Sequence, residues 1–298
     1  RINMNVLITG ASGMLGASMA KMFANSFNVF ATGQSDFKIP NVDYKKFDLL
    51  AGDYESLIKW SKPDVIVLSG AITNGNYCQE NPVYALQVNG VSVKKFIDAT
   101  EEKVKIIYIS TDAVFPSSLH MAKEIDFVLP ENTYGKSKEL GEFFLNTTSN
   151  RNFTIIRTTI VGLNINDKKS GFVEWIVNSS LNNQEIGLFG DVLFTPISIW
   201  DLIEEIKFLI ESDNINSETL HIAGESTTKY KFGKSLMENF NVSTENIKET
   251  SILSFKDRAK RCTDQTLDSS FYKKKYNRVL PDLESTVNII KKYYHAIN

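Results

Sequence analysis

Cysteine, histidine and proline are scarce in this chain of 298 residues, which has 2 Cys, 3 His and 7 Pro. Cys78 and Cys262 are too few for a disulfide framework, and the sequence contains no Cys-x-x-Cys pair that could hold zinc. The histidines are scattered along the chain. We therefore expect no metal site built on His and Cys.

An excess of charge of one sign and long hydrophobic runs are also missing. Lys and Arg number 33 and Asp and Glu 35, so the net charge is −2 and a nucleic acid is not an expected partner. No run approaches the roughly 18 apolar residues of a membrane span, and the first residues lead into a strand-like run without the apolar segment of a signal peptide. These absences predict a cytoplasmic protein that does not enter a membrane.

Short apolar runs alternate with helical patterns through the first half of the chain. Alternation of this kind predicts a parallel sheet that is covered by helices on both faces, the doubly wound (Rossmann) α/β fold. Two of the runs, 65–68 and 106–109, are continuously apolar, as strands buried on both faces are. The expected strands are 5–9, 28–32, 64–69, 105–110 and 154–158, and the expected helices 15–24, 54–60, 82–100 and 134–145.

The length of the chain, about twice that of a common domain, suggests a second lobe. After about residue 160 the alternation loosens, with a polar stretch at 162–171, helical patterns at 172–181 and 201–210, and a short strand at 220–223. We predict a dinucleotide-binding domain over residues 1–160. A smaller, interwoven substrate lobe covers 161–298, with parts of about 195–222 returning to the first domain.

Three glycines stand where the first strand meets the first helix, spaced as Gly-x-x-Gly-x-x-Gly. Gly10 can make the tight turn, Gly13 lets the backbone approach a pyrophosphate, and Gly16 allows close packing of the helix on the strand. Such glycines also occur in ordinary turns, but this position favours phosphates bound at a helix N-terminus. The predicted cofactor-binding residues here are Gly10, Ser12, Gly13, Met14, Leu15 and Gly16.

The choice of nicotinamide cofactor depends on the end of the second strand. An NAD site would place a carboxylate there, but Gln34 and Ser35 are neutral and no Arg lies beside them. The sequence therefore predicts NADPH, with NADH as the alternative. Asp48 and Leu49 follow a third short strand, where Asp48 could accept the adenine amino group or could be an isolated surface residue.

A second group of residues has the pattern of acid–base catalysis. Thr111 ends a predicted strand, and Tyr134 and Lys138 lie four residues apart on a predicted helix, so their side chains share one face. A nearby ammonium favours the phenolate and moves the phenol pKa from about 10 toward neutral pH. Alone, Tyr-x-x-x-Lys is typical of a solvated pair. Together with the glycine turn, it indicates a catalytic set.

With these motifs the chain resembles the extended short-chain dehydrogenases/reductases, and within them it is most similar to dTDP-4-dehydrorhamnose reductases. The likeness also covers Ser69-Gly70-Ala71, Glu80-Asn81-Pro82, Val88-Asn89, 110–115 and 130–138. The resemblance implies that Thr111, Tyr134 and Lys138 are catalytic, that Lys138 also holds the nicotinamide ribose, and that Ser69, Gly70 and Ala71 bind the cofactor.

Substrate contacts are expected after the fourth strand and in the second half. Thr73 and Asn74 are candidates by position. The loop 115–132, beginning with Phe115, is expected to overlie the substrate, whereas its His120 is expected to be an exposed loop residue. The resemblance adds Thr195 and Arg261. The chain departs from the family at Cys262 and Asp264, where Arg-Pro-x-Asn is usual, and at Asn76, where a carboxylate is common.

The function that this resemblance implies is NAD(P)H-dependent reduction of a nucleotide-activated 4-keto-6-deoxy sugar, with hydride added to C4 and a proton from Tyr134. A sugar-nucleotide 4-epimerase shares the same three residues and stays an alternative, as does a non-catalytic nucleotide-binding regulatory subunit. Ala113 replaces the Glu of related dehydratases and disfavours dehydration. The expected partner is the nucleotide-sugar substrate, and the chain could form a homodimer.

Overall fold

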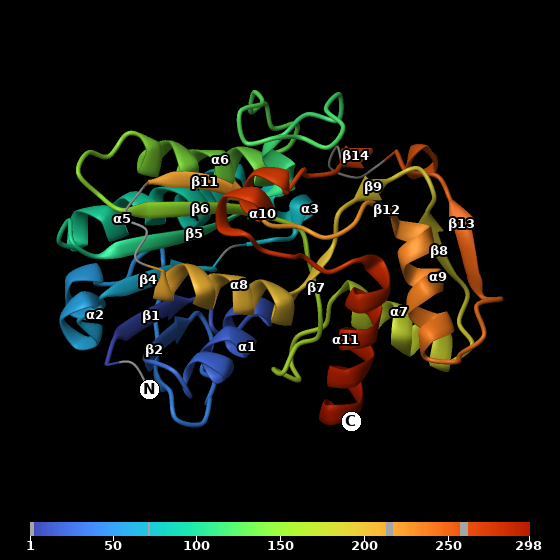
Figure 1. Cartoon of the computed structure of the whole chain (residues 1–298), viewed down its shortest axis with the longest axis horizontal. Coiled ribbons are helices and arrows are strands. Elements are labelled where there is room, and N and C mark those ends of the chain that lie inside the picture. The colour runs from blue at the N-terminus through green and yellow to red at the C-terminus, as the bar shows by residue number, and fades with distance from the viewer. Residues whose placement is uncertain (1–2, 71, 213–216, 257–261) are drawn as a thin grey trace.

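A seven-stranded parallel sheet forms the centre of the computed structural model, which describes residues 3–70, 72–212, 217–256 and 262–298 (Figure 1). The strand order is β11-β6-β5-β4-β1-β2-β3, and every neighbouring pair is parallel. This order confirms the predicted doubly wound fold. The strands are β1 (Asn5–Thr9), β2 (Asn28–Gly33), β3 (Asp43–Lys46), β4 (Val65–Leu68), β5 (Lys105–Thr111), β6 (Phe153–Thr158) and β11 (Glu218–His221).

Successive residues of the central strands enter two different hydrophobic cores. Ile107 and Ile109 of β5 belong to one core, whereas Ile106 and Tyr108 belong to the other. Side chains alternate across a strand, so a strand covered on both faces needs apolar residues at every position. This packing explains the continuous apolar runs that the sequence shows.

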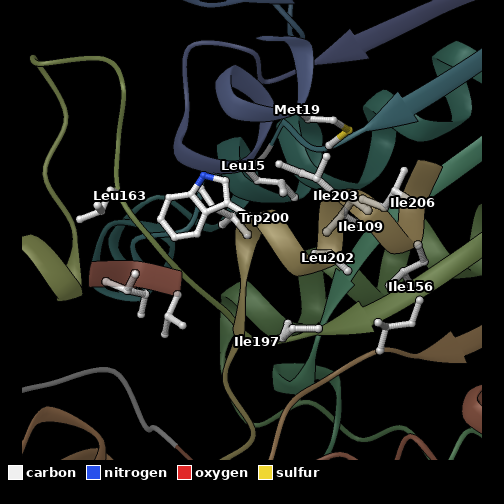
Figure 2. Packing of buried hydrophobic residues seen from close by; sticks show 14 of the residues in the cluster. Leu15, Met19, Ile109, Ile156, Leu163, Ile197, Trp200, Leu202, Ile203 and Ile206 are labelled. Atoms are coloured by element: carbon white, nitrogen blue, oxygen red, sulfur yellow. The ribbon is translucent and has the colours of Figure 1, made fainter. Parts of the chain in front are cut away.

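Helices from both halves of the chain cover the sheet. The helices of the first core include α1 (Met14–Phe23) and α8 (Ile199–Glu211), which pack against each other. Figure 2 shows Met19 of α1 and Ile203 of α8 in this core, with Ile109 and Ile156 of the sheet. The second core contains residues of α2 (Tyr54–Ser61), α5 (Ser92–Ala99) and α6 (Thr133–Asn146).

The predicted helix 82–100 is divided in the structure. It consists of α4 (Pro82–Ala85), a π-helical segment η1 (Leu86–Val91) and α5. The π segment packs closely on α6, because a Cβ atom added at Gly90 would lie 2.7 Å from a side-chain atom of Leu140. Such segments often occur at functional sites. The short helix α3 (Gly75–Glu80) was not predicted.

Small sheets and further helices make up the rest of the second half, and several of them lie together at one end of the molecule (Figure 1). In contrast, α8 packs on α1 and β11 joins the central sheet. No helix in the described part of the chain has both the length and the apolar character that a membrane span requires. The remaining elements are β7 (Ile160–Val161), α7 (Phe172–Leu181), β8 (Ile186–Phe189), β9 (Leu193–Phe194), β10 (Ile197–Ser198), β12 (Thr227–Thr228), α9 (Lys229–Asn239), β13 (Ile247–Thr250), β14 (Asp264–Gln265), α10 (Ser270–Tyr276) and α11 (Leu283–Ile297), with the 3-10 turns η2 (Asp112–Val114) and η3 (Ile252–Ser254).

The turn after β1 crosses the segment after β4 at very short range. Gly10 has a φ of 66°, and a Cβ atom there would lie 2.4 Å from the Cα atom of Gly70. A side chain at this position is therefore excluded by both the backbone conformation and the space. At Gly75, the first residue of α3, a Cβ atom would meet nothing within 4 Å.

These two glycines give a matched test of the crossing. We expect Gly10→Ala to lower the free energy of unfolding by at least about 2 kcal/mol, through strain and overpacking. Gly75→Ala should leave it unchanged or raise it slightly, because Ala is the better helix former. Urea unfolding of both variants measures the difference. Equal stabilities would show that the turn tolerates a side chain.

Candidate active site

A cavity of about 550 Å³ opens where the carboxyl ends of the central strands meet. Segments that are far apart in the sequence line it: the turn after β1, the ends of β2, β4, β5 and β6, the start of α6 and the segment 158–171. Ligands of doubly wound proteins bind at this edge of the sheet. The predicted site residues on its wall are Gly10, Ser12, Gly13, Met14, Leu15, Gly16, Gln34, Asp48, Leu49, Ser69, Gly70, Thr73, Thr111, Tyr134 and Lys138.

The glycine turn presents the N-terminus of α1 to the cavity. Gly13 caps α1 without a side-chain hydrogen bond, and the first turn of the helix carries no acidic residue. The positive end of the helix dipole thus meets the cavity without a competing carboxylate. The buried hydroxyl oxygens of Thr32 and Thr158, both on the cavity wall, have no hydrogen-bond partner among the described residues. A ligand in the cavity could supply the hydrogen-bond partner of each hydroxyl.

At the end of β2, the cavity wall includes Gln34 but not Ser35. The Gln34 amide lies 3.5 Å from the hydroxyl of Tyr84, and the carbonyl of Ser35 accepts a hydrogen bond from Tyr44 at 2.5 Å. The cationic residues on the wall are Lys138 and Lys169. Of the two positions predicted to contact the ribose, Gln34 is therefore the one that faces the cavity.

Thr111, Tyr134 and Lys138 all line the same cavity. Thr111 ends β5, and its Oγ1 accepts a hydrogen bond from the backbone of Ala113 at 3.1 Å. Helix α6 begins at Thr133, where Asn132 caps it by accepting a hydrogen bond from the Gly135 N–H at 2.8 Å. Tyr134 thus lies in the first turn of the helix, with Lys138 one turn later.

Burial governs the electrostatics of this pair. It raises the pKa of Tyr134 well above 10, and a side-chain hydrogen bond with Thr111 opposes the shift. Burial also lowers the pKa of Lys138 to about 7, against the influence of Glu142. The expectation that the ammonium brings the phenol pKa toward neutral was therefore wrong for this structure, because desolvation outweighs the charge. At neutral pH the phenol keeps its proton, as a proton donor must.

Buried polar residues hold α6 in place. Asn89, in the π-helical segment η1, donates hydrogen bonds to the carbonyl of Ile72 at 3.0 Å and to the Ser137 hydroxyl at 2.9 Å. The backbone N–H of Ile72 donates to the side-chain oxygen of Asn89 at 2.8 Å. The segment after β4 is thereby connected to the helix that bears Tyr134. The only sequence signal for this role was the Val88-Asn89 motif.

One side of the cavity was missed from the sequence. Asn164, Lys169, Ser170 and Gly171 line it, and the buried Asn166 donates a hydrogen bond to the carbonyl of Ser12 at 3.1 Å. This bond brings the segment over the glycine turn. The polar, turn-rich composition of 162–171 was its signal, but composition does not tell which surface a loop covers.

Three of the predicted substrate contacts lie outside the cavity wall. Asn74 caps α3 by accepting a hydrogen bond from Tyr77 at 3.0 Å. Phe115 is buried, and its ring centroid lies 4.9 Å from the guanidinium carbon of Arg157. Thr195 is fully buried and accepts a hydrogen bond from the Leu267 N–H at 3.2 Å. Each side chain has a structural partner, and its contact with substrate stays a prediction. Arg261 and Ala71 lie outside the described residues.

The loop 115–132 projects beyond α6 at the top of Figure 1. Ala122 in this loop donates a backbone hydrogen bond to Thr266 at 3.0 Å, which connects the loop to the segment that contains β14. His120 is 64% exposed in its side chain and pairs with Asp264 at 2.7 Å, so it is an exposed loop residue, as expected. The described residues contain no cluster of side chains suited to a metal ion.

The family described as the RmlD substrate binding domain matches residues 4–295 of the chain. Among curated relatives, a spore coat polysaccharide biosynthesis protein, SpsK, of Bacillus subtilis is 29% identical and covers 80% of each chain. A dTDP-4-dehydrorhamnose reductase of Aggregatibacter actinomycetemcomitans is 28% identical over 74% of this chain and 73% of its own. Among solved structures, the dTDP-4-dehydrorhamnose reductase of Bacillus anthracis in complex with NADP has a TM-score of 0.82, at 22% identity and coverage of 98% and 100%.

The burial of Lys138 can be tested through stability. Its pKa falls from 10.5 to about 7 on folding. Between these values the unfolded chain binds more protons than the folded one, so the stability of the wild type rises with pH across this window. We expect Lys138→Met to be more stable than the wild type near pH 6, and the advantage to shrink as the pH rises from 7 to 10.

Urea unfolding at several pH values measures the effect. Lys136→Met is the matched control, since Lys136 is exposed two residues earlier on the same helix, and its difference from the wild type should stay constant with pH. A constant difference for Lys138→Met as well would contradict the burial of a charged ammonium at this position.

Proposed function

The chain belongs to the RmlD substrate binding domain family, and from this premise we propose that it is an NAD(P)H-dependent reductase of a nucleotide-activated 4-keto-6-deoxy sugar. One observation carries the proposal: the protonated phenol of Tyr134 and the buried amine of Lys138 line the same cavity as the glycine turn. Both halves of a reduction, hydride delivery and proton delivery, thus have a place in the same cavity.

The nicotinamide cofactor supplies the hydride when it is bound. The residues that would hold it are the Gly10–Gly16 turn at the phosphates, Gln34 at the adenosine ribose, Asp48 and Leu49 at the adenine, and Ser69, Gly70, Ala71, Tyr134 and Lys138 toward the nicotinamide. In this proposal residues 1–160 form the dinucleotide-binding domain and 161–298 the sugar-nucleotide lobe, with parts of about 195–222 returning to the first domain and 164–171 covering the glycine turn. A cytoplasmic location and a homodimer belong to the same proposal.

The chain's own side chains handle the proton. Tyr134 donates its phenolic proton to the sugar oxygen as negative charge develops there. Thr111 hydrogen-bonds the same oxygen and fixes its position, since a donor that is already in place costs no reorganisation during the reaction. Lys138, as an ammonium, holds the ribose and stabilises the phenolate that Tyr134 leaves behind. Thr73, on the cavity wall, is a further substrate contact.

The alternatives share parts of this site. A dehydratase needs an additional acid, and Ala113 after Asp112 supplies none. A regulatory subunit would need the nucleotide site but no proton donor, so the Thr111–Tyr134–Lys138 set favours turnover. The proposal is tested by measuring NADPH oxidation with a panel of 4-keto-6-deoxy sugar nucleotides. Turnover with at least one of them is expected, and none with any of them would leave the regulatory reading as the better one.

Removal of the phenol separates proton donation from cofactor binding. We expect Tyr134→Phe to lower kcat by a factor of at least about 10³, with the Kd for NADPH nearly unchanged because the phosphates are held elsewhere. Lys138→Met should lower kcat and also weaken NADPH binding, since in this proposal the ammonium contacts both the ribose and the phenolate. Tyr77→Phe, at an exposed tyrosine of α3, is the control. If Tyr134→Phe kept most of its turnover, another group would be the acid.

Gln34 decides the cofactor preference in this account. The wild type should use NADPH at least as well as NADH. Gln34→Asp adds an acceptor for the ribose hydroxyls and repels a 2′-phosphate, and it should shift the ratio of kcat/KM values toward NADH about tenfold, or ~1.4 kcal/mol. Ser35→Asp places the same charge one residue away, outside the cavity wall, and should shift it less. A strong NADH preference in the wild type would overturn this reading.

A further inference from the structure

Glu142 is a buried carboxylate that the proposed reaction does not use. It lies on α6, one turn after Lys138, and is 3% exposed. Its Oε1 accepts a hydrogen bond from Nη2 of Arg157 at 2.6 Å, and Nε of Arg157 lies 3.1 and 3.2 Å from its two oxygens. The hydroxyl of Ser110 donates to Oε2. A buried carboxylate costs stability unless it is paired and hydrogen-bonded, and here it is both.

The other side of Arg157 meets a neutral residue. Nη1 of Arg157 lies 3.3 Å from Nε2 of His221, and Nδ1 of His221 lies 2.9 Å from the carbonyl of Ala122. Nδ1 therefore donates to the carbonyl, and Nε2 accepts from Arg157. Burial and the nearby guanidinium lower the pKa of His221 to about 3. Because the ring is uncharged, Glu142 is the charged partner hydrogen-bonded to Arg157.

Lys138 and Glu142 occupy the same face of α6, four residues apart. Ser110, which holds Oε2 of Glu142, directly precedes Thr111. The carboxylate therefore contacts the end of β5 and lies one turn from the amine, so it connects both elements that bear the proposed catalytic groups.

The other titratable groups around Lys138 are mostly uncharged. The Tyr108 ring, from β5, lies 4.5 Å from Nζ of Lys138, and burial raises the pKa of Tyr108 as it does that of Tyr134. Cys78 of α3 also has a raised pKa through burial. Asp112, in the turn after β5, is hydrogen-bonded to Thr111 and Thr159. The π-helical segment that packs on α6 brings no ionisable side chain, and on α5 Lys94 pairs with Asp98.

We propose that Glu142 is a positioning residue, whose carboxylate keeps Lys138 in its ammonium form and, with Arg157, holds the end of β5 against α6. The inference rests on the proposed function, in which the ammonium holds the ribose and stabilises the phenolate. The direction of the electrostatic effect supports it: burial lowers the pKa of Lys138 to about 7, and the charge of Glu142 acts in the opposite direction. Arg157 is hydrogen-bonded to Glu142, and a like charge at this position is expected to act on the ammonium in the opposite direction to Glu142.

The charge state of Lys138 can be followed without any ligand. In the full chain with ¹³C-labelled lysine, the Cε signal of Lys138 is identified by its loss in Lys138→Met. We expect a titration midpoint near 7 in the wild type. Glu142→Gln should lower the midpoint by about one pH unit, and Arg157→Met should raise it. Glu142→Asp, which keeps the charge, should leave it within a few tenths of a unit.

If a single variant fails to fold, a double variant that replaces both Glu142 and Arg157 with neutral residues takes its place. Removal of both charges leaves no unpaired buried ion. In Glu142→Gln/Arg157→Met the midpoint should still lie below that of the wild type, since Glu142 is the charged group that raises the pKa of Lys138. An unchanged midpoint in Glu142→Gln or in the double variant would overturn the proposal. So would shifts of the same sign in Glu142→Gln and Arg157→Met, which indicate general damage to the site.

Turnover gives a second readout. In Glu142→Gln the alkaline limb of the kcat profile should move down with the midpoint, so that activity falls about tenfold at pH 8 and only about twofold at pH 6. A purely structural role would lower activity equally at both pH values and would contradict the proposal. If the wild type reduces no sugar nucleotide while the midpoints shift as expected, the proposed function fails and the effect of Glu142 on Lys138 stands.

Discussion

Burial of the Lys138 ammonium is the constraint on which the rest of the site depends. A charged amine at 3% exposure is unfavourable by itself. The Tyr108 ring lies 4.5 Å from its Nζ, and the charge of Glu142, one turn along α6, favours the ammonium against this burial. The burial that makes the Lys138 ammonium unfavourable also keeps the Tyr134 phenol protonated, which is the form that can donate a proton.

The doubly wound sheet makes this arrangement possible. Parallel strands bring the turn after β1 and the end of β5 to one edge, although about a hundred residues separate them. Helix α6 then places Tyr134 and Lys138 at this edge. Its position is fixed by Asn132 at its start and by Asn89 from the adjoining π-helical segment. The close crossing of Gly10 over Gly70, which excludes a side chain, holds the turn after β1 against the segment after β4.

Much of the fold and of the site could be predicted from local patterns in the sequence. The strand β1 and the helix α7 were predicted with the bounds that the structure has. The glycine turn and the Thr111–Tyr134–Lys138 set were both recognised in the sequence, and in the structure they line one cavity. What could not be predicted depends on contacts between distant residues. The bond from Asn166 to Ser12 spans 154 positions, so no local pattern shows that 164–171 covers the turn. The pKa of Tyr134 depends on burial, which spacing along a helix does not reveal.

The central claim is that Tyr134 and Lys138 serve a net reduction, and the fate of the cofactor tests it most directly. An epimerase must return its hydride to the same sugar and gains by keeping its cofactor bound, whereas a reductase consumes one cofactor for each product. With labelled NADPH, we expect deuterium at C4 of the sugar and one cofactor oxidised per sugar reduced. Tightly bound NAD, with interconversion of sugars and no net oxidation of added cofactor, would contradict the account.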